Sequence, residues 1–454
     1  MKILLATNVF LPEFSGGTET LVHGIALALK RRGHAVVVLT GYPPTVDVEA
    51  GDRFDEYQID TIRVVRYKGG RALPSREANT MRLQYVDRSF EIGLRRLMNE
   101  FAPDVVHFHH LQRLSVTAID VCRERGTPAF LTATDYWCVC PTLNLLLNDG
   151  RICDGPTRDA ANCLKHMAAV RPTASWATRA LSYMPTGVVG VGMAWLKSAQ
   201  ASFAGQVGYA QALAQRGEAI ANRLLMLDRI FVPAKFMQTV MENNRLRGGR
   251  FRVLPYGLRT QGYNRRIRRV AGGVLVLGFI GSWLPHKGLH VLLDAMKRLP
   301  GTSRVKLKVY GSAPEKGTPY ALDLQMMASG DSRIEFCGTF ENRHIADVLD
   351  GIDALVIPSL WHENMPLVSL SAQAAGCPIV ASDVGGIGDV VQDGKNGLLF
   401  ARGSSPELAE LILRLLADDE LLARLSSQAI APADIETYVD DLETEYRRAC
   451  ARLN

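Results

Sequence analysis

The sequence has no long hydrophobic run and no secretion signal. No stretch reaches the about 20 apolar residues that a membrane-spanning helix needs. Residues 1–8 lack the apolar core and the small-residue cleavage site of a signal peptide. Internal repeats and low-complexity tracts are also absent. We therefore expect a cytoplasmic protein whose eight cysteines are reduced thiols or metal ligands rather than disulfides.

The chain also has little net charge. The 52 Lys and Arg residues exceed the 46 Asp and Glu residues by only six. This excess would tolerate a phosphorylated ligand or an anionic membrane surface, but it is too weak to indicate a nucleic-acid partner. Hydrophobic residues at 47% and charged residues at 22% are typical of a globular protein, and 454 residues predict two or three domains.

Two series of alternating strand and helix patterns fill the chain. Residues 2–6, 18–32 and 35–40 predict a strand, a helix and a second strand, which form a βαβ unit of a parallel sheet. Further strands and helices are expected at 104–107, 115–125, 129–133, 274–281, 305–310, 354–357, 378–381 and 406–417. The pattern predicts two doubly wound α/β domains with a cleft at the carboxyl ends of their strands.

Short motifs follow these strands in a specific order. The second series carries 279–288 (FIGSWLPHKG), 309–311 (VYG), 358–359 (PS) with 363–366 (ENMP), and 381–386 (ASDVGG), and the first carries 16–19 (GGTE), 32–34 (RGH) and 103–107 (PDVVH). In this ordered set the chain resembles the family-4 retaining glycosyltransferases, over nearly its whole length except about residues 167–215. The resemblance implies the GT-B fold, two Rossmann-like domains that face a central cleft. It also implies retaining sugar transfer from a nucleotide-diphosphate sugar to an acceptor, without a catalytic metal or a cofactor.

The motif residues suit a diphosphate leaving group. Lys287 offers a compact cation for the developing negative charge. Gly385-Gly386 precede a predicted helix from Ile387, whose free N–H groups favour a phosphate, and Gly16-Gly17 open the first helix in the same way. The alternatives are a solvated loop lysine and glycines that only form tight turns.

Glu363 is the first candidate for contact with the donor sugar. The resemblance makes it the first acid of a Glu-x7-Glu motif, although an acid there could instead cap a helix that starts near Pro366. The resemblance further places Asp135 near the reacting centre. Other donor-site candidates by resemblance are Ser282, Gly311, Thr339, Phe340, Asn364, Met365, Pro366, Leu367 and Ser371.

Three positions depart from the family pattern. Ser371 stands where the second acid belongs and cannot accept two hydrogen bonds from ribose as a carboxylate does. Ser282 replaces a phosphate-binding arginine, and Thr134 replaces the active-site histidine before Asp135. A retaining transfer draws acid–base help from the departing phosphate, so an active enzyme stays the main hypothesis. A degenerate binding or partner subunit, a nucleotide-sugar epimerase and a phosphorylase are the alternatives.

A cysteine-rich loop covers residues 138–166. Cys163 and His166 have a Cys-x2-His spacing, and with Cys140 and Cys153 they could hold one structural zinc ion. A set of reduced, partly buried thiols is the competing interpretation.

A helical insertion follows at about 167–215, and its segment 176–212 is rich in Ala, Gly, Val and aromatic residues. It could lie at a membrane interface, helped by arginines at 245, 247, 250, 252, 265, 266, 268 and 269. A helical lid or subunit contact beside a solvated basic linker is the alternative. With membrane contact, the acceptor would be a lipid-linked saccharide in surface-polysaccharide assembly.

We expect three parts. Residues 1–256 form the acceptor-side domain, 257–430 the nucleotide-sugar domain, and 431–454 a helix that returns to the first domain, with Tyr438, Leu442, Tyr446 and Cys450 on one face. The stretch from Val253 to Val270 is predicted as the interdomain linker. Which sugar, nucleotide and acceptor the protein uses does not follow from the sequence.

Overall fold

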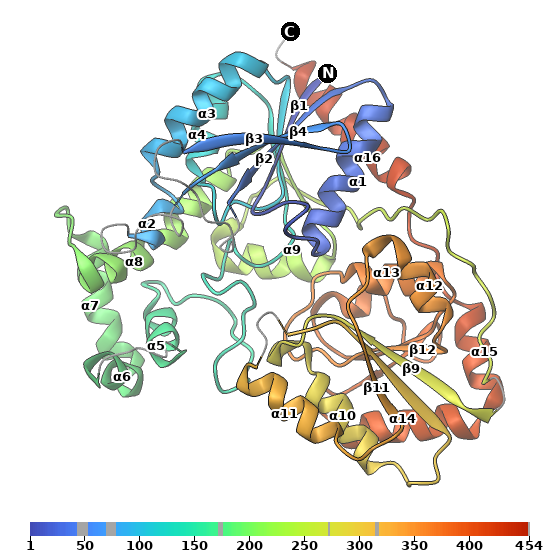
Figure 1. Ribbon diagram of the computed structural model, residues 1–454. Helices are drawn as coiled ribbons and strands as arrows, with labels where there is room; N and C mark the ends of the chain where they lie inside the picture. The colour runs from blue at the N-terminus through green and yellow to red at the C-terminus, as the bar shows by residue number, and fades with distance from the viewer. Residues whose placement is uncertain (43–52, 70–78, 171–175, 271–272, 314–316, 453–454) are drawn as a thin grey trace. The chain divides into compact units, whose positions relative to one another are not determined.

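Two parallel sheets organise the chain (Figure 1). The computed structural model describes residues 1–42, 53–69, 79–170, 176–270, 273–313 and 317–452. They separate into two compact units: unit 1 is Met1–Leu254 with Glu436–Asn454, and unit 2 is Pro255–Ile435. The prediction of an α/β class with two doubly wound domains is confirmed. Residues 453 and 454, with which the predicted tail ends, lie outside the described residues.

The sheet of unit 1 has eight strands in the order β3-β4-β2-β1-β5-β6-β7-β8. Neighbouring strands are parallel except β3 and β4. The central strands are continuous apolar runs because helices cover both faces of the sheet. The strands are β1 (Lys2–Thr7), β2 (Ala35–Gly41), β3 (Phe54–Ile59), β4 (Ile62–Tyr67), β5 (Val105–Phe108), β6 (Ala129–Thr132), β7 (Arg229–Val232) and β8 (Phe251–Val253).

Helices α1 and α16 cover one face of this sheet, and α3 and α4 cover the other (Figure 1). Beyond the sheet, α5 to α8 form the helical insertion. The helices of unit 1 are α1 (Gly17–Arg31), α2 (Thr80–Leu83), α3 (Arg88–Phe101), α4 (Thr117–Glu124), α5 (Ala161–Val170), α6 (Trp176–Tyr183), α7 (Thr186–Ser198), α8 (Gly205–Leu224), α9 (Lys235–Met241) and α16 (Ile435–Cys450).

The C-terminal helix α16 packs into unit 1 through buried polar contacts. The hydroxyl of Tyr446 shares a hydrogen bond with His107 Nδ1, and His107 Nε2 lies 2.9 Å from Thr132 Oγ1. At the edge of the helix, Arg32 pairs with Glu443 at 2.6 Å. Because the tail contacts strands β5 and β6 directly, it is part of the core of unit 1.

The sheet of unit 2 has six parallel strands in the order β11-β10-β9-β12-β13-β14. Helices α10 and α14 lie on one face and α12 and α13 on the other (Figure 1). The strands are β9 (Leu275–Ile280), β10 (Val305–Tyr310), β11 (Ile334–Gly338), β12 (Ala354–Ile357), β13 (Ile379–Ser382) and β14 (Gly397–Phe400). The α-helices are α10 (Leu289–Arg298), α11 (Pro319–Ala328), α12 (Ile345–Asp350), α13 (Leu367–Ala374), α14 (Ser405–Ala417) and α15 (Asp419–Ser427).

The arginine-rich stretch before β9 is attached to unit 2, although most of its residues are exposed. Arg268 is fully buried and donates hydrogen bonds to the carbonyl oxygens of Ile352 (3.0 Å) and Ala375 (3.1 Å). Arg266 pairs with Asp350 at 2.8 Å. These arginines satisfy carbonyl groups at the ends of α12 and α13, so the stretch is part of unit 2.

Candidate active site

In both sheets the strand order reverses at one point, and the predicted site residues lie there. Unit 2 reverses between β9 and β12, and unit 1 reverses between β1 and β5. The loops after the two strands at such a point diverge to opposite faces, which leaves a crevice outside their carboxyl ends where ligands of α/β sheets bind.

At the reversal point of unit 2, Lys287 and Glu363 form an ion pair. Lys287 follows β9 in a short 3-10 turn (Pro285–Lys287), and Glu363 follows β12. Glu363 Oε1 accepts hydrogen bonds from Lys287 Nζ (2.8 Å), Ser359 Oγ (2.7 Å) and Trp361 Nε1 (2.7 Å). The alternative interpretation of Glu363, a helix cap, is not what the structure shows, because α13 begins at Leu367 without a side-chain cap.

The electrostatics of the pair keep Glu363 charged. Burial would raise the pKa of this carboxyl, but the Lys287 ammonium and the hydrogen bonds from Ser359 and Trp361 hold the pKa below its ordinary value. Neighbouring His286 is neutral, because burial and the Lys287 charge lower its pKa to about 4. The Lys287 ammonium also lies 4.9 Å from the centre of the Trp361 ring, a distance at which cation–π attraction acts. One carboxylate group and one ammonium group, both charged, thus lie at the carboxyl ends of β9 and β12.

Glycines let the backbone of these loops approach closely. Gly288 has φ +73°, and a Cβ there would lie 1.8 Å from the carbonyl oxygen of Pro358. Gly311, after β10, has φ +125°, and its Cβ would lie 2.0 Å from the carbonyl oxygen of Gly281. Only glycine fits such contacts at positive φ. The loops after β9, β10 and β12 are therefore in direct backbone contact.

The remaining donor-site candidates lie around this centre. Gly385, at φ +53°, approaches Glu363, whose carbonyl oxygen accepts the Gly386 N–H at 2.6 Å. The α-helix predicted from Ile387 is wrong: a five-residue 3-10 turn, Gly385–Asp389, follows β13 instead. This turn has at most a small dipole, so the phosphate-binding argument for Gly385-Gly386 rests on close backbone approach alone.

Two tyrosines that the sequence did not single out contact candidate residues. Tyr263 donates to Ser371 Oγ at 2.9 Å, and the Asn364 amide donates to Tyr256 OH at 3.2 Å. A hydroxyl pair therefore occupies the position of the family's second acid. Ser282 and Thr339 are exposed, Met365 is buried, Phe340 packs against Tyr310, and Pro366 and Leu367 start α13.

At the reversal point of unit 1, a carboxylate covers the start of α1. Gly16 is the residue before α1 and Gly17 its first residue. A Cβ on Gly16 would lie 2.6 Å from Glu19 Oε2. Burial raises the pKa of Glu19. Hydrogen bonds from the backbone N–H groups of Glu19 and Gly16 offset part of this rise. A carboxylate of the chain itself thus occupies the predicted phosphate position.

A histidine that the sequence analysis missed lies beside Asp135. Asp135 Oδ2 accepts a hydrogen bond from His110 Nε2 at 2.7 Å, since His110 Nδ1 accepts the Gln112 N–H. Asp135 Oδ1 accepts the Trp137 N–H at 2.7 Å. Because β5 and β6 are neighbours, His110, which follows β5, lies beside Asp135, which follows β6. His110 thus fills the position beside the acid where Thr134 replaces the family's histidine. The run of histidines that ends β5 was the available signal.

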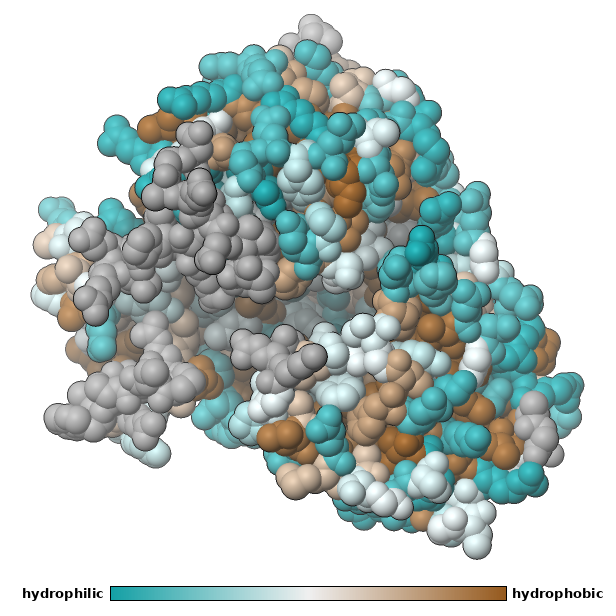
Figure 2. Space-filling view, in the orientation of Figure 1, coloured by the Kyte–Doolittle hydropathy of each residue, from teal (hydrophilic) through white to brown (hydrophobic). Residues whose placement is uncertain are grey.

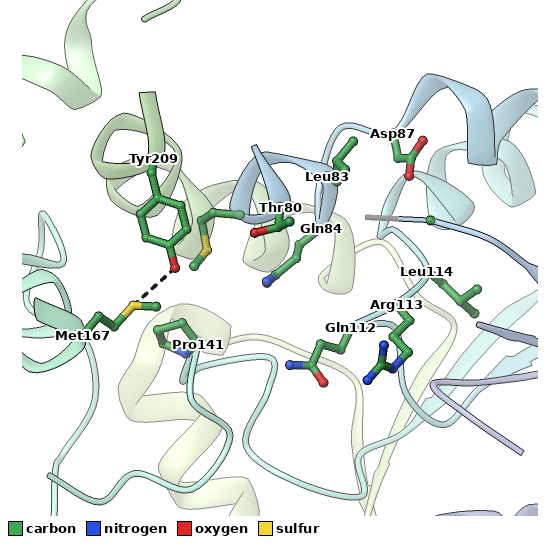
Figure 3. A pocket seen from close by; sticks show the side chains of 12 residues that line it. Thr80, Leu83, Gln84, Asp87, Gln112, Arg113, Leu114, Pro141, Met167 and Tyr209 are labelled. Atoms are coloured by element: carbon green, nitrogen blue, oxygen red, sulfur yellow. Dashed lines mark hydrogen bonds between the residues drawn. The ribbon is translucent and has the colours of Figure 1, made fainter. Parts of the chain in front are cut away.

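A cavity of about 70 Å³ lies next to this cluster in unit 1 (Figure 3). Gln112 and Arg113, from the loop after His110, line one side, and the helical insertion contributes Met167 and Tyr209. The hydroxyl of Tyr209 donates to Met167 Sδ at 3.8 Å. The cavity mixes amide, guanidinium and apolar groups, as a pocket for a polar organic molecule does.

The predicted zinc ligands share one small cavity but do not form a metal site. Cys140, Cys153, Cys163 and His166 all line it. Among the residues that the structure describes, however, no three His, Cys, Asp or Glu side chains are arranged to hold a metal ion. The cysteines are free thiols, and burial raises the pKa of Cys153 and Cys163. The zinc hypothesis is thus not supported by this arrangement.

Family models match both units. The model for Glycosyltransferase Family 4 matches residues 15–137, and the model for Glycosyl transferases group 1 matches residues 274–418. The chain belongs to the family-4 glycosyltransferases. The two matches include the residues at both reversal points, from Gly16 to Asp135 and from Lys287 to Glu363.

Curated relatives of this family-4 glycosyltransferase include D-inositol 3-phosphate glycosyltransferases. The protein of Rhodococcus erythropolis is 30% identical over 194 residues, which cover 40% of this chain and 43% of that protein. The protein of Stackebrandtia nassauensis is 32% identical over 199 residues, covering 41% and 45%. The chain thus aligns with less than half of the length of these relatives.

Solved structures resemble nearly the whole of this family-4 chain. Sucrose-phosphate synthase from Thermosynechococcus elongatus has a TM-score of 0.65 at 16% identity, with 99% of both chains covered. HepE from Anabaena, in complex with UDP, has a TM-score of 0.65 at 17% identity and covers 99% of this chain and 100% of its own. These likenesses show the fold, and the predicted GT-B class is confirmed.

We predict that Glu19→Gln stabilises this family-4 glycosyltransferase at neutral pH. The folded-state pKa of Glu19 is raised above its ordinary 4.5. Its favourable contribution is therefore complete below that value and is lost as the pH rises through the raised pKa. Urea unfolding should show no gain for the variant near pH 4 and a growing gain toward about pH 8. The control Glu91→Gln, at a partly exposed carboxylate on α3, should show no such trend. A gain that is equal at all pH values contradicts the prediction.

Proposed function

We propose that the protein transfers a sugar from a nucleotide-diphosphate sugar to an acceptor, with retention at the anomeric carbon and without a catalytic metal. The observation that carries this proposal is the Lys287–Glu363 pair at the strand reversal of unit 2. HepE from Anabaena has been solved in complex with UDP and glucose and in complex with UDP-glucose. A nucleotide sugar of this class suits the charges of the pair.

In the proposed reaction, Lys287 turns from Glu363 to the donor diphosphate. Its side chain is 27% exposed, so it can reach a ligand without unfolding the loop. Its ammonium group then stabilises the negative charge that develops on the leaving diphosphate. Glu363, held ionised, accepts hydrogen bonds from hydroxyl groups of the donor sugar and orients the anomeric carbon. The departing phosphate oxygen takes the proton from the acceptor hydroxyl as the new bond forms.

We further propose that unit 1 binds the acceptor. Asp135, oriented by His110, follows β6, which is the neighbour of β5. Gln112 and Arg113, from the loop after His110, line the cavity of Figure 3. The carboxylate of Asp135 is 20% exposed and can contact a sugar hydroxyl. The mixed lining of the cavity suits a saccharide or a lipid-linked saccharide, which agrees with a role in surface-polysaccharide assembly.

The second candidate is a catalytically degenerate GT-B subunit that only binds the nucleotide sugar. Ser371 favours this candidate, because the hydroxyl proton of Tyr263 is already donated to Ser371 and neither side chain carries a charge that could replace the family's second acid. Binding of the nucleotide sugar with neither hydrolysis nor transfer to an acceptor would identify this function.

A thermal-shift screen tests the donor site. UDP, GDP, ADP and TDP, with their common sugar conjugates, are mixed with the native chain, Lys287→Ala and Lys306→Ala, which removes an exposed lysine on β10. A ligand at a hundredfold excess over its dissociation constant stabilises the fold by about 2.7 kcal/mol. We expect one nucleotide family to raise the melting temperature of the native chain and of Lys306→Ala, and Lys287→Ala to lose most of the shift. The absence of any shift with the native chain would rule out both functions.

A further inference from the structure

The helical insertion presents an apolar surface to solvent, the α6–α7 surface, which consists of Tyr183, Met184, Val188, Val191 and Trp195. Tyr183 is 87% exposed, Val191 74% and Trp195 63%. Val188, Val191 and Trp195 follow one another at helical spacing and form one stripe of α7. Exposed apolar patches of this kind mark interaction sites rather than ordinary surface.

The stripe is not the packing face of α7. Val189 and Met193, four residues apart on another face of the helix, are buried where α7 contacts α5 and α8. Gly187, Gly190 and Gly192 have open space at their Cβ positions, so no segment among the residues that the structure describes covers them. Figure 1 shows α6 and α7 at the end of the insertion farthest from the sheet of unit 1, and Figure 2 shows brown, apolar residues at that edge.

Negative charge is absent from the sequence around this surface. Between Asp159 and Glu218 there is no Asp or Glu, although a stretch of this length would hold about six at the average of the chain. Lys165 and Lys197 flank α7: Lys165 Nζ donates to Thr186 Oγ1 at its start, and Lys197, in its last turn, pairs with Glu218 at 2.9 Å. Of the arginines expected to help, Arg252 pairs with Asp441 and Glu445, and Arg266 pairs with Asp350. Lys165 and the lack of carboxylates in this stretch are therefore the charge features on which docking depends.

We propose that the α6–α7 surface docks on an anionic lipid bilayer. No helix in the described part of the chain is long and apolar enough to cross a membrane, and α7 itself is only about 20 Å long at 1.5 Å per residue. A helix of this kind lies in the headgroup region, with Trp and Tyr rings at the boundary between lipid and water. Lysines beside it attract anionic headgroups, and the lack of carboxylates removes the repulsion. A second copy of the chain would bring the same charges to this surface and gains nothing from the missing carboxylates.

Docking would bring the acceptor cavity to the membrane. The same insertion supplies Met167 and Tyr209 to the cavity wall (Figure 3). A saccharide carried on a lipid could then reach unit 1 without leaving the bilayer. The docking itself does not depend on the donor site or on the proposed transfer.

Vesicle flotation tests the proposal. The native chain is mixed with phosphatidylcholine vesicles that contain about 30% phosphatidylglycerol, at about 0.1 M salt. We expect the protein to float with them, and the double variant Val191→Glu/Trp195→Glu to bind at least tenfold more weakly. The control Ile92→Glu replaces a half-exposed residue on α3 and should bind as the native chain does. Brominated lipid should quench native fluorescence more than that of Trp195→Phe.

Three outcomes would overturn the proposal. The native chain could stay with the unbound fraction, or the double variant could bind as the native chain does. A third is concentration-dependent self-association that the double variant abolishes while vesicle binding is unchanged, which would make the surface a contact between copies. An unchanged ligand-free melting temperature of the double variant shows that it is folded, and this keeps the test separate from that of the transferase.

Discussion

Replacing Glu363 by glutamine is expected to slow donor cleavage by about 100-fold, equivalent to about 2.7 kcal/mol of transition-state stabilisation. The substitution keeps the size of the side chain, and Ser359 and Trp361 can still donate to the amide oxygen. What disappears is the charge that pairs with Lys287 at 2.8 Å and that would bind the hydroxyl groups of the donor sugar. Hydrogen bonds to a charged group are about twice as strong as neutral ones.

The measurement is release of the nucleoside diphosphate into water from the nucleotide sugar that the thermal-shift screen selects. It needs no acceptor. Glu420→Gln serves as control, because it removes an exposed carboxylate of unit 2 and should leave the rate unchanged. The affinity for the nucleoside diphosphate alone should stay within about threefold, since Lys287 remains. An equal loss of diphosphate affinity and of cleavage rate would assign Glu363 to binding only.

The same substitution has a pH signature in stability. The folded-state pKa of Glu363 is lowered, so the carboxylate stabilises the fold fully above its ordinary pKa of 4.5 and less as the pH falls through the lowered value. The native chain should therefore exceed Glu363→Gln in unfolding free energy at neutral pH. The difference should narrow in acid.

Local motifs explain why the centre of unit 2 could be predicted. Lys287 and Glu363 each stand in a short loop directly after a buried strand, and a parallel sheet brings such loops to one edge. His110 and Asp135 meet by the same rule. Their pairing was missed because it depends on β5 and β6 being neighbours, which a list of motifs does not contain.

Composition was a weaker guide than strand order. The run that includes Arg268 has the charge of a solvated linker. Arg268 itself is buried, because carbonyl groups at the ends of α12 and α13 accept its hydrogen bonds. Six strands were not predicted: β4 and β7 inside the sheet of unit 1, and β3, β8, β11 and β14 at sheet edges. In β3 and β8 polar residues interrupt the apolar pattern. The α-helix predicted after Gly386 does not form, because the backbone there turns so that the Gly386 N–H bonds to the carbonyl oxygen of Glu363.

Gly288→Ala is expected to cause the largest loss of stability among the substitutions considered. Gly288 has φ +73°, and an alanine Cβ would lie 1.8 Å from the carbonyl oxygen of Pro358. The left-handed conformation alone costs a residue with a Cβ about 1–2 kcal/mol. Relief of the contact requires movement of the backbone after β9 or after β12, because the clashing atom is a carbonyl oxygen.

Gly394→Ala is a matched control for the conformational cost. Gly394 has φ +69°, and nothing lies within 4 Å of its Cβ position. The excess destabilisation of Gly288→Ala over Gly394→Ala thus measures the clash, and we expect at least about 2 kcal/mol, or a further fall of about 4–8 °C in the melting temperature. Because Lys287 precedes Gly288, the variant should also lose the nucleotide-induced thermal shift, whereas Gly394→Ala should keep it. Equal losses in the two variants would show that the loops after β9 and β12 can separate at no cost, and that the Lys287–Glu363 geometry does not depend on their contact.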